Sequence, residues 1–107
     1  MYRVVDANSF EGRRKPIAAE LGARAIRLNR FDSQPGQEGF AHDEEASGQE
    51  EIYVPVAGSG FIRIGDDEVP LEPGRFVLVG AEETRQVIAG PDGLSYVVVG
   101  AAVSDPA

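Results

Sequence analysis

The sequence predicts a single all-β domain, built as a sandwich or a barrel. The chain has 107 residues, enough for one hydrophobic core but not for two. Its hydrophobic content of 42% is sufficient to form that core. From residue 23 onward, short runs of β-forming residues recur about every 8–12 residues, separated by turns rich in Gly and Pro. We therefore expect short strands packed around one core.

The N-terminal region differs from the rest of the chain. Residues 1–22 are polar in their middle part, and we expect them to form a mostly irregular N-terminal arm. Within the arm, IAAEL (17–21) can make one helical turn that ends at Gly22. A helix of this length is too short to be stable by itself.

The predicted barrel spans residues 23–103, and residues 104–107 form a C-terminal tail. In the first strand, ARAIRLNRF (23–31), apolar and polar residues alternate, which leaves open whether Arg27 and Asn29 face the interior. Pro55 cannot donate a backbone hydrogen bond, so we place it at a bulge or facing an unpaired edge. We expect Arg63 to be exposed. The other predicted strands are EIYVPVAG (51–58), FIRIG (61–65), EVPLEPG (68–74), RFVLVG (75–80), TRQVIAG (84–90) and LSYVVVGAAV (94–103).

Charge and composition exclude several classes of function. The formal net charge is −8, which disfavours nucleic acids and anionic membranes as partners. The chain has no cysteine, which rules out disulfides and thiolate chemistry. Residues 1–20 contain no apolar run of the kind found in secretory signals, so we expect a cytoplasmic protein that binds neither nucleic acid nor membrane. The basic run Arg13-Arg14-Lys15 is interpreted as a solvated loop first and as an anion contact second.

The segment HDEEASGQEE (42–51) is the most informative for function. It contains the one histidine of the chain and five acidic side chains. Asp43, Glu45 and Glu50 are typical of a solvated loop. Glu51 differs, because the alternation of a strand places it on the same face as Tyr53 and Pro55, opposite Ile52, Val54 and Val56.

The spacing of several residues resembles the two sequence motifs of the cupin superfamily. Five positions carry the first motif: Gly36, His42, Glu44, Glu51 and Gly58. Five positions of GRFVLVGAEETRQVIA fall at the intervals of the second motif: Gly74, Gly80, Glu82, Arg85 and Ala89. The resemblance covers roughly residues 23–100. The sequence is also similar to a subgroup of small bacterial cupins that read His-x-Glu, then Gln-Glu-Glu, then Arg in the second motif.

The resemblance implies a small jelly-roll β-barrel whose interior site holds a divalent metal through three His and one Glu. Position by position, His42 is the first His, Glu44 replaces the second, Glu51 is the Glu, and Arg85 replaces the third His. The interval between Glu44 and Glu51 is two or three residues longer than in the family. Carboxylate oxygen suits divalent metals, whereas a guanidinium has no lone pair to offer. The candidate metal ligands are therefore His42, Glu44 and Glu51. We expect the site to hold either no metal or one divalent ion of Fe, Mn, Zn or Ni.

Arg85 has two possible roles. It can point into the barrel and pair with Glu51 or Glu44, leaving a metal-free pocket. It can instead turn to the barrel mouth and hold an anionic ligand through its guanidinium. Both alternatives predict a loss of function or stability in Arg85→Ala, but only the first predicts a rescue when Glu51 is also removed.

Two functions of different classes follow. The first is a module that binds a small polar or anionic molecule in the barrel, with ligand contacts from Arg85, Glu51, His42 and Tyr53. The alternative is a metal-dependent enzyme of isomerase, lyase or dioxygenase type, in which His42, Glu44 and Glu51 hold the metal and Arg85 orients an anionic substrate. Tyr53 and Tyr96 are interpreted as core aromatics with satisfied hydroxyls. The sequence leaves open whether the protein is an enzyme and which residues are catalytic.

The resemblance also implies a homodimer. If Glu51 faces into a barrel, the β-branched residues Ile52, Val54 and Val56 face outward and need cover from a second sheet or a partner subunit. A monomer at micromolar concentration in analytical ultracentrifugation would contradict this expectation.

Overall fold

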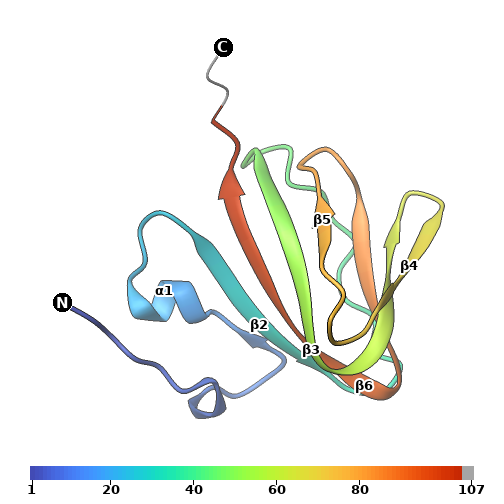
Figure 1. The fold of residues 1–107 in the computed structure, drawn as a ribbon, viewed down its shortest axis with the longest axis horizontal. Coiled ribbons are helices and arrows are strands. Elements are labelled where there is room, and N and C mark those ends of the chain that lie inside the picture. Colours follow the sequence, from blue (N-terminus) through green and yellow to red (C-terminus); the bar gives the residue numbers. More distant parts are fainter. Residues whose placement is uncertain (105–107) are drawn as a thin grey trace.

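The computed structural model describes residues 1–104 and shows an all-β jelly-roll fold, as the sequence predicts (Figure 1). Residues 105–107 of the expected tail lie outside the described residues. The elements in chain order are η1 (Ala7–Ser9), β1 (Arg14–Lys15), α1 (Ile17–Leu21), β2 (Arg27–Ser33), β3 (Gln49–Ile64), β4 (Asp67–Leu71), β5 (Val77–Val79) and β6 (Arg85–Ala102).

All strands pair antiparallel, in the order β1-β2-β6-β3-β4, and β5 pairs with the first half of β3. The two longest strands, β3 and β6, pair with each other along almost their whole length and bend together. One layer therefore contains β1, β2, β5, the first half of β3 and the second half of β6. The other layer contains β4, the second half of β3 and the first half of β6, and the cavity described below lies on the inner face of this folded sheet.

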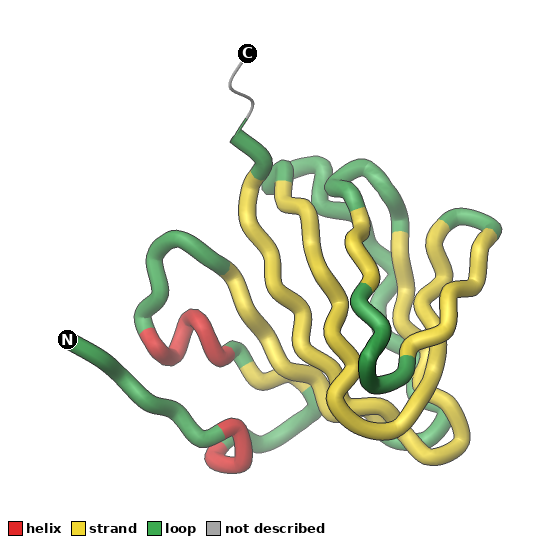
Figure 2. The backbone as a smooth tube through the Cα atoms, viewed as in Figure 1, coloured by secondary structure: helices red, strands yellow, loops and turns green. Residues whose placement is uncertain are grey.

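The sequence predicted separate strands at 51–58 and 61–65, and again at 84–90 and 94–103. That prediction was wrong, because each pair is one continuous strand, β3 or β6. Figure 2 shows β3 and β6 as continuous strands that curve from one layer to the other. The ladder between them shifts register between Pro55 and Ala57 and again between Gly58 and Gly60. The placement of Pro55 at a bulge is thus confirmed. Glycines that are typical of turns here allow a strand to bend without ending.

Gly58 is required at this bend for two reasons. Its φ is +76°, a backbone conformation that residues with a Cβ rarely adopt. A Cβ at this position would also lie 2.2 Å from the carbonyl oxygen of Gly93 on β6. β3 and β6 can therefore approach each other closely at this bend only because Gly58 has no side chain.

The core lies between the two layers and confirms the predicted alternation in β3. Tyr53 is 3% exposed and Pro55 is buried, whereas Ile52 and Val56 on the opposite face are 41% and 43% exposed. The buried apolar cluster consists of Tyr53, Ile62, Leu71, Val79, Val87, Ala89, Leu94, Tyr96 and Val98.

The layer that contains β1, β2 and β5 has an apolar outer face. Ile52 pairs in register with Leu78 of β5 and with Val99 of β6, so the three side chains share one face of the sheet. Leu78 is 60% exposed, and Phe76 beside β5 is also exposed. The homodimer predicted from the sequence would cover this face, and it stays a prediction.

The N-terminal arm is attached to the edge of the sheet. Arg14 pairs with Phe31 and Lys15 with Arg30, which extends the sheet beyond β2. Lys15 is buried and its Nζ lies 2.7 Å from Asp32 Oδ2, so the prediction of a solvated loop was wrong for this residue. Burial raises the pKa of Asp32, but hydrogen bonds from Lys15 and neighbouring groups outweigh it and lower the pKa to about 2.

The single helical turn predicted at residues 17–21 is confirmed as α1, which ends at Gly22 in a left-handed conformation. It lies beside β2 (Figure 1). No helix within residues 1–104 is both long enough and apolar enough to cross a lipid bilayer.

Candidate functional site

The candidate site lies in a cavity of about 800 Å³ on the inner face of the folded sheet. Its lining comes from β2, β3 and β6, from the N-terminal arm and from the loop before β3. The lining includes all of the residues that the sequence analysis selected: His42, Glu44, Glu51, Tyr53 and Arg85.

Backbone hydrogen bonds fix His42 and Glu44 at the edge of the cavity. The amide of His42 donates to the carbonyl of Arg85 at 3.0 Å, and the amide of Arg85 donates back to the carbonyl of His42 at 2.8 Å. The amide of Glu44 donates to the carbonyl of Ala81 at 2.8 Å. The loop that precedes β3 is therefore held against the start of β6.

The extra residues between Glu44 and Glu51 form a compact turn. The amide of Gly48 donates to the carbonyl of Glu44 at 2.8 Å, and Gly48 has a φ of +69°. The Ser47 hydroxyl donates to Glu44 Oε1 at 2.9 Å. The longer interval is thus absorbed locally, and both carboxylates face the cavity.

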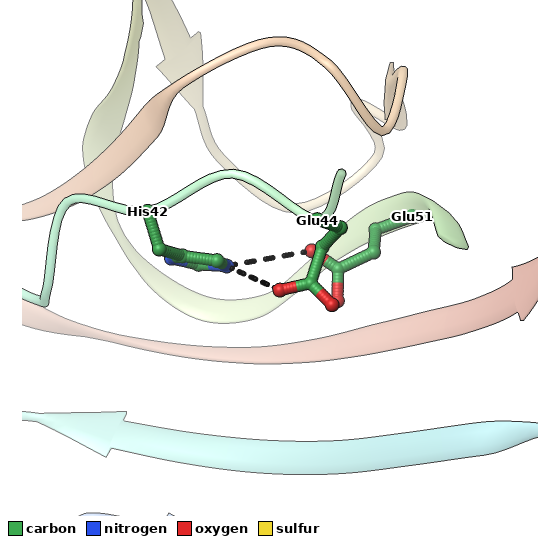
Figure 3. A group of neighbouring side chains, drawn as sticks. All are labelled: His42, Glu44 and Glu51. Atoms are coloured by element: carbon green, nitrogen blue, oxygen red, sulfur yellow. Dashed lines mark ion pairs between the residues drawn. The ribbon is translucent and has the colours of Figure 1, made fainter. Parts of the chain in front are cut away.

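His42, Glu44 and Glu51 form a cluster whose potential ligand atoms all lie within 4.8 Å of one another (Figure 3). His42 Nε2 lies 3.4 Å from Glu44 Oε2 and 3.7 Å from Glu51 Oε1. These distances exceed those of ordinary N–H···O hydrogen bonds. Two ligands on one metal at the usual bond lengths lie roughly 3.0–3.4 Å apart, so small shifts would place all three on one ion.

The other nitrogen of His42 determines what this cluster can hold. Nδ1 lies 3.2 Å from the carbonyl oxygen of Phe40, which can only accept a hydrogen bond. Nδ1 therefore carries the proton, and in neutral His42 the lone pair of Nε2 points toward the two carboxylates. Three electron-rich atoms converge on one point, and either a proton on Nε2 or a cation between them relieves their repulsion. This donor set fits a divalent metal ion.

Arg85 points into the barrel and is 1% exposed. Its Nη2 donates to Glu51 Oε1 at 3.1 Å, and its Nε donates to the Tyr53 hydroxyl at 3.3 Å. Its Nη1 donates to the backbone carbonyls of Gly80 and Glu83. Of the two predicted alternatives, the structure places Arg85 in the pair with Glu51 rather than at the mouth. The pair uses Oε1 of Glu51, which is also the oxygen that lies 3.7 Å from Nε2 of His42.

Tyr53 completes this network. Its hydroxyl donates to Glu51 Oε1 at 3.0 Å while it accepts from Arg85. Burial and the negative charge of Glu51 raise the pKa of Tyr53, so it is a neutral donor at physiological pH. Arg85 and Tyr53 together hold the Glu51 carboxylate in one orientation beside His42.

Sequence reasoning did not place four arginines that also line the cavity: Arg13, Arg14, Arg24 and Arg27. The basic run at residues 13–15 and the alternation at Arg27 were the available signals. Neither could locate the side chains, because that depends on how the two-residue strand β1 pairs with β2. Arg63 is exposed and pairs with Glu68, and Asp43, Glu45 and Glu50 are exposed, as predicted.

Comparisons with known proteins define the fold. No protein-family model and no curated protein sequence matches the chain. A cupin protein from Bacteroides fragilis superimposes with a TM-score of 0.81 at 20% identity, over 99% of this chain and 88% of that one. An RmlC-like cupin protein from a Desulfovibrio desulfuricans subspecies gives a TM-score of 0.72 at 18% identity, over 94% and 92% of the two chains.

A third similar structure, described as a sugar phosphate isomerase of the cupin superfamily from Silicibacter pomeroyi, gives a TM-score of 0.74 at 16% identity, over 94% and 76%. At these identities the likeness establishes the fold alone. The chain is a small protein with the cupin fold. Its cavity carries a His-Glu-Glu cluster beside a buried arginine that pairs with Glu51.

Proposed function

We propose that this protein binds a small polar molecule in its barrel, beside a divalent cation held by His42, Glu44 and Glu51. The observation that carries the proposal is the convergence of two carboxylates on Nε2 of His42, the ring nitrogen that does not face the carbonyl of Phe40. One nitrogen and two carboxylate oxygens suit Mn²⁺ and Fe²⁺, and they also accept Zn²⁺ and Ni²⁺. When bound, the cation would act as a Lewis acid that orients and polarises an oxygen atom of the bound molecule.

The chain's own residues have separate roles in this proposal. Arg85 and Tyr53 both bond to Oε1 of Glu51 and fix the orientation of its carboxylate. Ser47 bonds to Oε1 of Glu44 and leaves Oε2 directed at His42. Such outer partners typically change metal affinity by about 10- to 100-fold when removed.

The metal content of the purified protein tests the proposal. Protein prepared without a His-tag or chelator is expected to contain about one equivalent of a transition metal per chain by inductively coupled plasma mass spectrometry. His42→Ala and Glu51→Ala are expected to lose it, because each removes one of three ligands. Glu45→Ala is the matched control, since Glu45 neighbours Glu44 but is exposed and outside the cluster. Absence of metal from the wild type after incubation with Fe²⁺, Mn²⁺, Ni²⁺ and Zn²⁺ would contradict the cation site.

A metal-dependent enzyme is the second candidate, because the cluster opens onto a cavity large enough for a small substrate. One solved structure with the same fold is described as a sugar phosphate isomerase, which suggests a substrate class to try. Metal-loaded protein incubated with sugar phosphates should then change their proton NMR spectra, and His42→Ala should not. Unchanged spectra for the wild type would argue against this isomerase activity.

A further inference from the structure

We infer that the part of the cavity formed by β2 and the N-terminal arm is an anion-binding subsite, so that the ligand is a small molecule with a phosphate or carboxylate group. The inference rests on the proposed function, since it names the class of molecule that the same cavity takes. The subsite consists of arginines from the N-terminal arm and β2: Arg13, Arg14, Arg24 and Arg27.

The distribution of charge carries the inference. The chain has 10 Lys and Arg residues against 18 Asp and Glu residues, yet five of the basic residues line the cavity. Among the described residues, Glu44 and Glu51 are the only acidic ones in that lining. A chain with a net charge of −8 thus concentrates half of its positive charge in one cavity.

Most of this positive charge is not neutralised within the protein. Arg85 pairs with Glu51, which leaves four of the five arginines. Within residues 1–104, Arg14, Arg24 and Arg27 make no ion pair, and all three are exposed to solvent at the cavity. A cavity wall with several positively charged side chains attracts and concentrates anions from solution.

Arg13 is held in place by aromatic residues. Its guanidinium lies over the ring of Phe31, 4.9 Å from the ring centroid. It is also close enough to Tyr96 to lower the pKa of that hydroxyl, against the larger effect of burial, which raises it. Arg14 is in register with Phe31, on the strand next to it. The ring of Phe31 thus helps to hold the guanidinium of Arg13 at the cavity.

Strand register places Arg27 of this subsite on the same wall of the cavity as Glu51, two strands away. Arg27 on β2 pairs with Gly100 on β6, and Gly100 pairs with Glu51 on β3. Directly paired residues of antiparallel strands share a face, so Arg27 and Glu51 both belong to the inner face. Their backbones are two strand spacings apart, roughly 10 Å. The glycine between them has no side chain of its own, and the amide oxygen of Gln49 lies 2.9 Å from where its Cβ would be.

This arrangement selects for a molecule with two different ends. Guanidinium groups bind carboxylate and phosphate oxygens through paired hydrogen bonds. The end near Glu51 meets hydrogen-bonding groups and the cation site, whereas the charged side chains at the end near Arg27 are all positive. A molecule with hydroxyl or carbonyl oxygens at one end and a carboxylate or phosphate group at the other satisfies both ends of the cavity.

Binding of simple anions to metal-free protein tests the subsite. The probes are inorganic phosphate and citrate, each titrated at constant ionic strength in EDTA and followed by ¹H–¹⁵N NMR. At least one probe is expected to saturate and to shift amides of β1 and β2, and the stronger probe shows whether phosphate or carboxylate is the preferred group. Arg27→Gln and Arg14→Gln are each expected to weaken that binding about tenfold, because each removes charged hydrogen bonds to the anion.

Arg75→Gln is the matched control, because it removes the same charge from an exposed residue that does not line the cavity. It is expected to change the affinity less than twofold. Equal weakening in Arg75→Gln and Arg27→Gln, or no saturation by either probe, would overturn the subsite. The Mn²⁺ affinity of Arg27→Gln is measured in parallel. Loss of anion binding with intact Mn²⁺ binding reports on the subsite alone, whereas failure of the wild type to bind Mn²⁺ reports on the proposed function.

Discussion

Replacing Arg85 with alanine is expected to lower the free energy of unfolding by about 3–5 kcal/mol when metal is removed with EDTA. The guanidinium is buried and bonds to Glu51, to Tyr53 and to two backbone carbonyls. Its removal leaves the carboxylate of Glu51, whose side chain is 14% exposed, without its charged partner. Urea denaturation followed by circular dichroism measures the loss.

A second substitution separates the ion pair from the other contacts of Arg85. Adding Glu51→Ala to Arg85→Ala is expected to restore part of the lost stability, because no unpaired carboxylate then remains in the barrel. Adding Glu45→Ala instead is the control, since Glu45 is exposed and does not contact Arg85. Equal stabilities of the two double variants would show that the pair with Glu51 is not what Arg85 contributes.

Gly58→Ala is expected to destabilise the fold by about 2–5 kcal/mol. About 1–2 kcal/mol comes from the positive φ, and the rest from overlap with the backbone of β6. Gly36→Ala is the matched control, because Gly36 has a φ of +71° but nothing within 4 Å of the position of a Cβ. Gly36→Ala should therefore be destabilised only by the cost of the positive φ, about 1–2 kcal/mol.

The same urea titration compares the two glycine variants. Gly58→Ala should exceed Gly36→Ala by about 1–3 kcal/mol. Equal losses would mean that β3 and β6 do not approach each other at this bend as closely as described, and the fold of the sheet over the cavity would need revision.

Local patterns predicted the inward-facing residues well. The alternation of EIYVPV depends only on neighbouring residues, so it correctly placed Tyr53 and Pro55 on the buried face. The spacing around His42 correctly selected the cluster with Glu44 and Glu51. The sequence could not show whether the longer interval between the two acids keeps them together. That depends on the turn closed by Gly48, which is formed by hydrogen bonds rather than by a residue pattern.

Features that depend on distant pairing were not predictable in the same way. Gly58 and Gly93 are of a residue type that is typical of turns. In the structure they lie inside the continuous strands β3 and β6, because the two strands bend together. Arg13 and Arg14 line the cavity because β1 attaches the N-terminal arm to β2, a pairing that no local pattern indicates. The role of Arg85 required knowing that Tyr53, Glu51 and the carbonyls of Gly80 and Glu83 all surround its guanidinium.

The coordination of Mn²⁺ by His42 is the most direct test of the cation site. The chain has one histidine, so an imidazole nitrogen bound to the metal can come from no other residue. Electron spin echo envelope modulation of the Mn²⁺-loaded protein is expected to show coupling to one histidine nitrogen, and His42→Ala is expected to lose it. Mn²⁺ bound without that nitrogen coupling would mean that the acidic surface, rather than the His42–Glu44–Glu51 cluster, holds the ion, and the account of the site would be contradicted.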